Sequence, residues 1–260
     1  MTPPPPLYGL HGRVALVTGG TSGIGKACVE RLRAEEMVVA FTGRNEERGR
    51  AVAAATGAVF LACDARDRAG SDHSVAEALR IGGRLDLLVA NAGIIFGGTI
   101  EATPEPAFRE LVEVNLTAVF RHARACFAAM RDQGGGSIVV LASDTAIRGA
   151  HEIPAYSVTK AGALAVAELF AAEGAPHGVR ANAVCPGDVV PGVQATPEGH
   201  DEHAEDPAGW TLPPSGRFGT GADVAALVAW LASDESSHMT GAALRIDGGM
   251  GAAMRAVTRV

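Results

Sequence analysis

The sequence predicts an α/β fold, a doubly wound parallel sheet of about seven strands with helices on both faces. Short apolar runs rich in valine, leucine and isoleucine alternate with longer helix-forming segments along nearly the whole chain, and this alternation is typical of a parallel sheet with crossover helices. The first apolar run ends in a glycine-rich turn that leads into a helix, where such folds bind ligands. The chain has 260 residues, which suits one domain with a substantial core.

The expected elements follow one another in a regular order. Arg13-Val-Ala-Leu-Val-Thr18 is aliphatic and β-branched, which indicates a buried parallel strand. Further strands are expected at 37–42, 58–62, 85–90, 136–142, 179–184 and 243–246. Helices are expected at 23–34, 45–55, 67–80, 105–131, 154–175 and 221–233. Because helices separate the strands, we expect parallel pairing and a single Rossmann-like domain over 12–260.

Two segments break this rhythm. Residues 1–11 contain four successive prolines and no basic stretch, so we expect a flexible arm rather than a signal peptide. Residues 187–219 contain five prolines and are too long for a routine connection, which predicts a lid or binding loop.

The glycine-rich turn predicts a dinucleotide site. Its sequence is Thr18-Gly19-Gly20-Thr21-Ser22-Gly23-Ile24-Gly25, between the first strand and the first helix. Glycine lets the backbone approach a pyrophosphate closely, and the helix N-terminus attracts its charge. The candidate cofactor-binding residues here are Gly19, Thr21, Ser22, Gly23, Ile24 and Gly25.

A second motif predicts proton transfer. Pro154 can begin a helix, which places Tyr156 and Lys160 four residues apart on one helical face. A nearby ammonium favours the phenolate form, so we expect Lys160 to lower the pKa of Tyr156. Ser143 ends the apolar run at 137–142 and is placed to hydrogen-bond a substrate oxygen beside Tyr156.

These motifs, in this order and spacing, resemble the short-chain dehydrogenase/reductase family from about Gly12 to Gly249. The resemblance implies hydride transfer between a nicotinamide and a substrate, interconverting a carbonyl and a secondary alcohol, with Tyr156 as general acid/base. It implies a catalytic set of Asn115, Ser143, Tyr156 and Lys160, in which Asn115 orders a water. It also implies further cofactor contacts at Asp64, Ala65, Asn91, Ala92, Gly93, Tyr156, Lys160, Pro186 and Gly187.

One position departs from the family pattern. Where the family usually has a threonine that holds the nicotinamide carboxamide, this chain has Pro191. Proline has neither a hydroxyl nor an N–H. We therefore expect the carboxamide to be held by the backbone at Val189 or by Thr196.

The end of the second strand predicts the choice of cofactor. An acidic residue there would bind the ribose 2′-hydroxyl, whereas an arginine would accommodate a 2′-phosphate. The sequence has Gly43 at the expected acidic position, followed by Arg44. This favours NADP(H), with NAD(H) as the alternative, because Ser22 adds no basic group.

Three residues are candidates for lining the substrate pocket: Asp144, His151 and Trp210. Asp144 follows Ser143 directly, His151 lies between Ser143 and Tyr156, and Trp210 lies in the expected lid. The lid is acidic and contains two histidines, which suggests a solvated face or a cationic substrate. No ligand spacing indicates a metal site.

Composition limits the partners. The net charge of −7 argues against nucleic acid and anionic membranes. Cys28, Cys63, Cys126 and Cys185 are scattered, as expected of reduced thiols in a cytoplasmic protein. We expect a small-molecule substrate and a homotetramer. The resemblance implies the tetramer, and close packing of another subunit is expected at the small residues Ala161, Gly162, Ala163, Ala165 and Ala167.

Two other functions fit the motifs. Reduction of a C=N bond would use the same residues, with the tyrosine proton going to nitrogen. A non-catalytic NADP-binding regulator would keep the fold, but it predicts damage to the Asn-Ser-Tyr-Lys set, which is intact.

Overall fold

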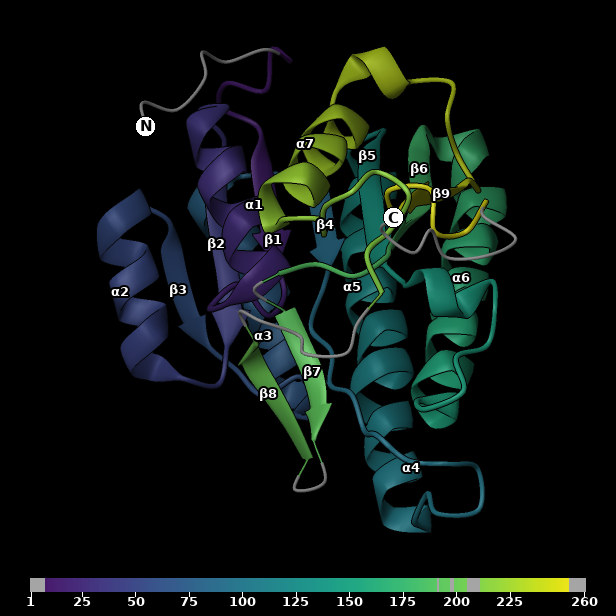
Figure 1. Ribbon diagram of the computed structural model, residues 1–260. Helices are drawn as coiled ribbons and strands as arrows, with labels where there is room; N and C mark the ends of the chain where they lie inside the picture. The colour runs from purple at the N-terminus through teal and green to yellow at the C-terminus, as the bar shows by residue number, and fades with distance from the viewer. Residues whose placement is uncertain (1–7, 191, 197–198, 205–210, 253–260) are drawn as a thin grey trace.

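The computed structural model describes residues 8–190, 192–196, 199–204 and 211–252. Seven parallel strands form one sheet in the order β3-β2-β1-β4-β5-β6-β9. They are β1 (Val14–Val17), β2 (Val38–Gly43), β3 (Val59–Ala62), β4 (Leu87–Ala90), β5 (Gly136–Leu141), β6 (Val179–Pro186) and β9 (Ala243–Ile246). The predicted doubly wound sheet is confirmed (Figure 1).

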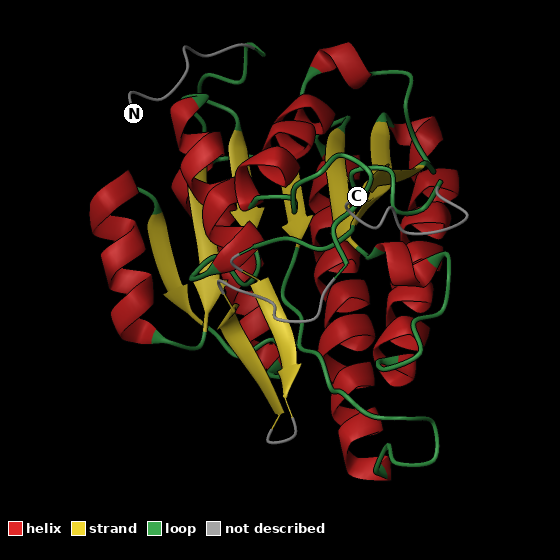
Figure 2. Ribbon diagram, in the orientation of Figure 1, coloured by secondary structure: helices red, strands yellow, loops and turns green. Residues whose placement is uncertain are grey.

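Helices cover both faces of the sheet (Figure 2). One layer contains α1 (Gly23–Ala34), α2 (Glu46–Thr56) and α7 (Gly221–Ala232), and the other contains α3 (Arg68–Gly82), α5 (Ala118–Asp132) and α6 (Pro154–Gly174). The inner strands of the sheet are buried on both faces, whereas the edge strands β3 and β9 are not. In β1, for example, Val14 and Leu16 pack against one layer, while Ala15 and Val17 pack against the other. This two-sided burial explains the continuous apolar runs in the sequence.

The strand order places the site. From β1 the chain proceeds outward through β2 to β3, then crosses back to β4 on the other side of β1. The loops after β1 and β4 therefore diverge at the carboxyl edge of the sheet, and a crevice opens there.

The predicted helix at 105–131 is not continuous. The structure has α4 (Glu105–Val112), a π-helical turn (Glu113–Thr117) and then α5. Asn115 lies in this turn, where its side-chain amide donates to the Ile94 carbonyl at 2.8 Å and to Thr159 Oγ1 at 3.1 Å. Its Oδ1 accepts from the Ile94 N–H at 2.8 Å. A π turn inserts a residue into the helix, and here the inserted turn lies where Asn115 makes these tertiary contacts. No local sequence pattern predicts either the turn or the contacts.

The expected lid contains a two-stranded antiparallel sheet formed by β7 (Gly192–Thr196) and β8 (Gly199–Ala204). Figure 1 shows this hairpin beyond the carboxyl ends of β1 and β4. Before the hairpin, Val190 N–H donates to the Gly219 carbonyl at 2.9 Å, which joins the two ends of the segment. Trp210 and Pro191 lie outside the described residues.

The small residues of α6 do not all face outward as expected. Ala163 and Ala167 are buried in the protomer's own core. A Cβ added at Gly162 would lie 3.0 Å from Leu116 Cδ2, so Gly162 also packs inward. Only Ala161 and Ala165 remain exposed, because a period of 3.6 residues divides consecutive positions between two faces.

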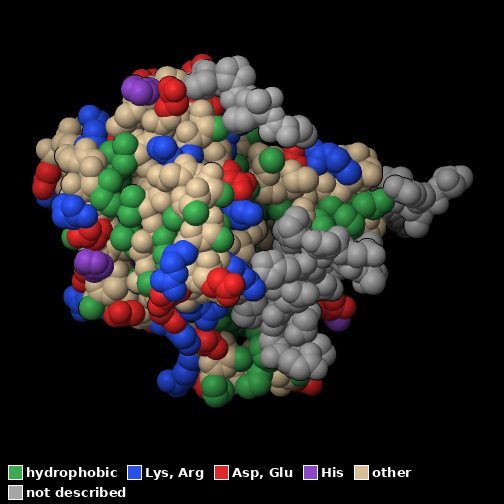
Figure 3. All heavy atoms as spheres, turned by 90° about the vertical axis from the view of Figure 1, so that its left-hand side faces the viewer, with side chains coloured by type: hydrophobic (Ala, Val, Ile, Leu, Met, Phe, Trp, Pro, Cys, Tyr) green, Lys and Arg blue, Asp and Glu red, His purple; other side chains and the backbone are tan. Residues whose placement is uncertain are grey.

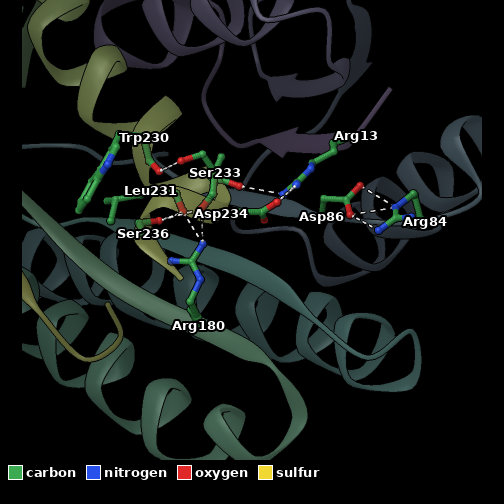
Figure 4. Close-up of polar contacts among 10 residues, drawn as sticks. Arg13, Arg84, Asp86, Arg180, Trp230, Leu231, Ser233, Asp234 and Ser236 are labelled. Atoms are coloured by element: carbon green, nitrogen blue, oxygen red, sulfur yellow. Dashed lines mark hydrogen bonds and ion pairs between the residues drawn. The ribbon is translucent and has the colours of Figure 1, made fainter. Parts of the chain in front are cut away.

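At the opposite edge of the sheet, two arginines hold the C-terminal end of α7 (Figure 4). Arg180 donates to the carbonyls of Leu231 at 2.8 Å and Ser233 at 3.3 Å. Arg13 donates to Asp234 at 2.7 Å and to the Ala232 carbonyl at 3.4 Å. Cations stabilise this end of a helix because its last carbonyls lack helical partners.

The outer face over α2 and β3 mixes charges of both signs (Figure 3). Arg50 and Glu46 form an exposed ion pair there at 3.0 Å. The described part of this face has no extended patch of charge of a single sign. Exposed ion pairs such as this one contribute little to the stability of the fold.

Candidate active site

A cavity of about 1140 Å³ lies along the carboxyl edge of the sheet. It is lined by the glycine-rich turn, the ends of β2 to β6 and the N-terminal turns of α6. Twenty of the predicted site residues line it: Gly19, Thr21, Ser22, Gly23, Ile24, Gly25, Arg44, Asp64, Ala65, Asn91, Ala92, Gly93, Ser143, Asp144, His151, Tyr156, Lys160, Pro186, Gly187 and Val189. Asn115 is fully buried and does not line it, and Trp210 lies outside the described residues.

The glycine-rich turn fits a pyrophosphate. Gly19 and Gly23 have φ values of +68° and +50°, which side chains rarely adopt. A Cβ at Gly25 would lie 2.2 Å from the Gly19 carbonyl oxygen, so no other residue fits there without movement. Ser22 makes no side-chain hydrogen bond to the first turn of α1, and the amides of that turn remain available to an anion.

Asn91 holds this turn against the loop after β4. Its side-chain amide donates to the carbonyls of Thr18 at 3.0 Å and Gly19 at 3.1 Å. In return, Thr18 Oγ1 accepts from the backbone N–H groups of Asn91 and Ala92, both at 3.0 Å. Asn91 therefore positions the two loops on either side of the crevice.

Any side chain at the end of β2 would require Thr21 to move. A Cβ at Gly43 would lie 2.3 Å from Thr21 Cγ2. Arg44 follows and is exposed at the same end of the cavity. The Asp64 carboxylate accepts from Arg66 Nη2 at 2.6 Å. Hydrogen bonding to Arg66, with a smaller contribution from Arg44, lowers the pKa of Asp64.

The residues that the sequence predicts for proton transfer lie together at the other end of the cavity. Lys160 Nζ donates to the Leu141 carbonyl at 2.7 Å and lies 5.6 Å from the centroid of the Tyr156 ring. Ser143 Oγ accepts from the Thr145 N–H at 3.2 Å and from the Thr145 hydroxyl at 3.1 Å. The same Oγ donates to the Asp144 carboxylate at 3.1 Å.

The expectation that Lys160 lowers the pKa of Tyr156 is wrong for the protein alone. Burial raises the pKa of Tyr156 to about 12, while the hydrogen bond to Ser143 lowers it and the charge of Asp144 raises it. Burial also lowers the pKa of Lys160 to about 8. Both shifts have one cause, because removing a group from water disfavours its charged form.

Sequence reasoning missed several residues of the cavity wall. They include Thr42, Cys63, Ile94, Ile95, Thr99, Val114, Thr145, Ile153, Asp188, Thr211 and Met250. Asp188 carried the clearest signal, because it directly follows the Pro186-Gly187 turn. Burial and the nearby Asp144 raise the pKa of Asp188 to about 6.

Within the described ranges, no group of three His, Cys, Asp or Glu side chains is arranged to hold a metal ion. None of the helices in the described part of the chain is long and apolar enough to cross a membrane.

Comparison with known proteins agrees with this geometry. The profile of the family described as enoyl-(acyl carrier protein) reductase matches residues 19–251. A 3-alpha-(or 20-beta)-hydroxysteroid dehydrogenase of Mycobacterium bovis is 36% identical over 92% of this chain and 90% of its own length. An acetoacetyl-CoA reductase of Rhizobium meliloti is 35% identical over 91% of this chain and 98% of its own. A 3-oxoacyl-[acyl-carrier-protein] reductase of Escherichia coli is 33% identical, covering 92% and 98%.

All three of these relatives are named for oxidation or reduction at a carbonyl or hydroxyl group. The fold, the open glycine-rich turn and the Ser-Tyr-Lys set lead to the same conclusion as the sequence matches. The chain belongs to the short-chain dehydrogenase/reductase family of oxidoreductases.

Proposed function

We propose that this protein is an NADP(H)-dependent oxidoreductase that interconverts a carbonyl and a secondary alcohol, with Tyr156 as general acid/base. The supporting observation is that one cavity contains both the open glycine-rich turn and the side chains of Ser143, Tyr156 and Lys160. The nicotinamide, when bound, supplies or accepts the hydride. The chain's own residues position the substrate and transfer the proton.

In reduction, the Tyr156 hydroxyl donates its proton to the substrate oxygen as negative charge develops on it. Its raised pKa keeps Tyr156 protonated at neutral pH, which suits an acid. Ser143 Oγ lies beside it and is placed to hold the substrate oxygen. The Lys160 ammonium is buried close to the Tyr156 ring, so its positive charge stabilises the phenolate that forms after proton transfer.

Asn115 acts indirectly, through the groups that it positions. It is fully buried in the π-helical turn and joins the loop after β4 to α6 through Ile94 and Thr159. Gly93 lies between the two parts of the site, because a Cβ there would be 3.3 Å from Asn115 Oδ1 and 3.5 Å from Lys160 Nζ. We assign Asn115 to ordering a water that reaches Lys160.

The preference for NADP(H) is supported by the end of β2. Gly43 lacks the carboxylate that would bind a ribose 2′-hydroxyl, and a Cβ there would meet the Thr21 side chain, whereas Arg44 offers a cation at the same end of the cavity. A 2′-phosphate carries the charge that a guanidinium binds well.

A homotetramer is supported by an exposed aliphatic stripe on α6. Val158, Ala161, Ala165 and Leu169 recur at helical spacing and are all exposed, with Val158 and Leu169 at 59%. Phe120 on the neighbouring α5 is 43% exposed. We place the protein in the cytoplasm, in keeping with its four unpaired thiols, Cys28, Cys63, Cys126 and Cys185.

The reaction is tested by following the nicotinamide absorbance with NADPH and NADH across a panel of ketones, imines and secondary alcohols. Turnover of ketones and alcohols is expected. Turnover of imines alone would replace the proposal with C=N reduction, and no turnover with any member, despite cofactor binding, would favour a non-catalytic regulator.

A further inference from the structure

Two carboxylates in the wall of the cavity that contains Tyr156 have no part in the reaction as described. Asp144 follows Ser143 at the end of β5, and Asp188 follows the turn at the end of β6. Strands β5 and β6 pair in parallel, with Leu141 opposite Val184, so the two residues lie at neighbouring strand ends. Both line the cavity.

The charge of Asp144 acts on both the reacting phenol and the second carboxylate, because it raises the pKa of Tyr156 and of Asp188. The pKa of Asp144 is itself raised, chiefly by burial, while hydrogen bonds from Ser143 and Thr145 and the charge of Arg245 oppose that shift. Asp144 therefore lies close to the phenol, and Asp188 lies at the neighbouring strand end in the wall of the same cavity.

Nothing in the described part of the chain neutralises Asp188. Its carboxylate has no hydrogen bond or ion pair among those residues, and its side chain is open to the cavity. The cations among the lining residues are Arg44 at the cofactor end and Lys160, whose ammonium donates to the Leu141 carbonyl. Arg245 acts on Asp144, but no cation among the described residues acts on Asp188, and a partly desolvated carboxylate without a counter-ion is unfavourable until a positive group arrives.

We propose that the substrate carries a protonated amine close to its reacting carbonyl or hydroxyl carbon, and that Asp188 and Asp144 bind this ammonium. The inference rests on the proposed oxidoreductase function. It also gives the Ser143–Asp144 hydrogen bond a consequence. An uncharged substrate must compete with a carboxylate for the Ser143 hydroxyl, whereas an ammonium on Asp144 weakens that competition.

The test uses three secondary alcohols that differ at one substituent: 1-amino-2-propanol, 1-methoxy-2-propanol and 3-hydroxybutyrate. Their dissociation constants are measured by calorimetry on the full chain saturated with NADPH, which cannot oxidise an alcohol, and their oxidation is followed by nicotinamide absorbance with NADP⁺. We expect the amine to bind best and the carboxylate worst. We expect Asp188→Asn to reduce the preference for the amine over the ether at least about tenfold, as expected when a charged hydrogen bond is lost.

Asp132→Asn is the matched control, because it removes the same charge from an exposed residue outside the cavity. It should leave the preference unchanged. If the wild-type protein binds the ether or the carboxylate as tightly as the amine, or if Asp188→Asn keeps the preference, the inference is overturned. Turnover of an uncharged alcohol that is lost in Tyr156→Phe would then leave the oxidoreductase function standing, so the two failures are distinguishable.

Discussion

The Ser143 hydroxyl donates to the carboxylate of Asp144 at 3.1 Å, and both groups lie in the wall of the cavity that contains Tyr156. A hydroxyl placed to hold the substrate oxygen is thus bound to an anion in the protein alone. The charge of Asp144 also raises the pKa of Tyr156. The residue after the proposed catalytic serine therefore influences both the hydrogen-bond donor and the acid/base.

Replacing Asp144 by asparagine should shift the pH profile. Loss of the negative charge lowers the pKa of Tyr156, because the phenolate is no longer repelled. In alcohol oxidation Tyr156 acts as the base, so kcat rises as pH rises through its pKa. We expect the rising limb of kcat for an uncharged alcohol to move to lower pH in Asp144→Asn. If the rising limb of kcat lies at the same pH in the variant as in the wild-type protein, while cofactor binding is intact, Asp144 does not act on the phenol.

Tyr156→Phe should keep the fold and cofactor binding while kcat falls by about 10²- to 10⁴-fold, the usual contribution of a general acid/base. Phenylalanine fills the same space but has no proton to donate. Lys160→Met is a companion variant, since it removes the ammonium and keeps much of the aliphatic chain. Tyr156→Phe turning over at near the wild-type rate would refute the assigned role.

The choice of cofactor should depend on Arg44 and on the contact between Gly43 and Thr21. Arg44→Ala is expected to weaken NADP(H) binding by about tenfold or more, since a charged hydrogen bond is lost, and to change NAD(H) binding little. Gly43→Asp alone should impair both cofactors, because its Cβ would lie 2.3 Å from Thr21 Cγ2.

The double variant Gly43→Asp with Thr21→Ala removes that methyl group and should favour NAD(H). Binding of each cofactor is measured by fluorescence titration. Equal losses for both cofactors in Arg44→Ala would mean that Arg44 does not contact the phosphate.

His122 should make the fold less stable in acid. It is 2% exposed on α5, its Nδ1 lies 2.9 Å from the Ala118 carbonyl, and its Nε2 has no partner among the described residues. Burial lowers the pKa of His122 below that of a free histidine. The unfolded chain therefore binds this proton more readily, and stability falls as pH drops below about 6.5.

His122→Leu keeps a similar volume and removes the titration. Urea unfolding at pH 7.5 and pH 5.5 should show a smaller loss of stability in acid for the variant than for the wild-type protein. An identical loss in both would assign the acid sensitivity to other groups.

The exposed stripe on α6 should mediate assembly. Leu169→Asp places a charge within the expected subunit contact, so the mass measured by light scattering should fall below that of the wild-type protein. Ile100→Asp is the control, because Ile100 is 81% exposed but lies outside α6. A monomeric wild-type protein would refute the tetramer.

The sequence by itself determined the elements and the chemistry of the motifs. Glycines at 19, 23 and 25 and the four-residue spacing of Tyr156 and Lys160 are local features, and they predict a turn and a helical face without knowledge of the rest of the fold. Buried strands can also be recognised in the sequence, because both of their faces require apolar side chains.

Only the tertiary structure decided which groups meet and how they titrate. Asp144 and Asp188 share a cavity because β5 and β6 pair side by side although the paired residues are 43 positions apart in the chain. The π-helical turn at Asn115 accompanies bonds to Ile94 and Thr159, both distant in sequence. Lys160 does not bring the pKa of Tyr156 down because burial, which depends on everything packed around the pair, outweighs the spacing of the two residues.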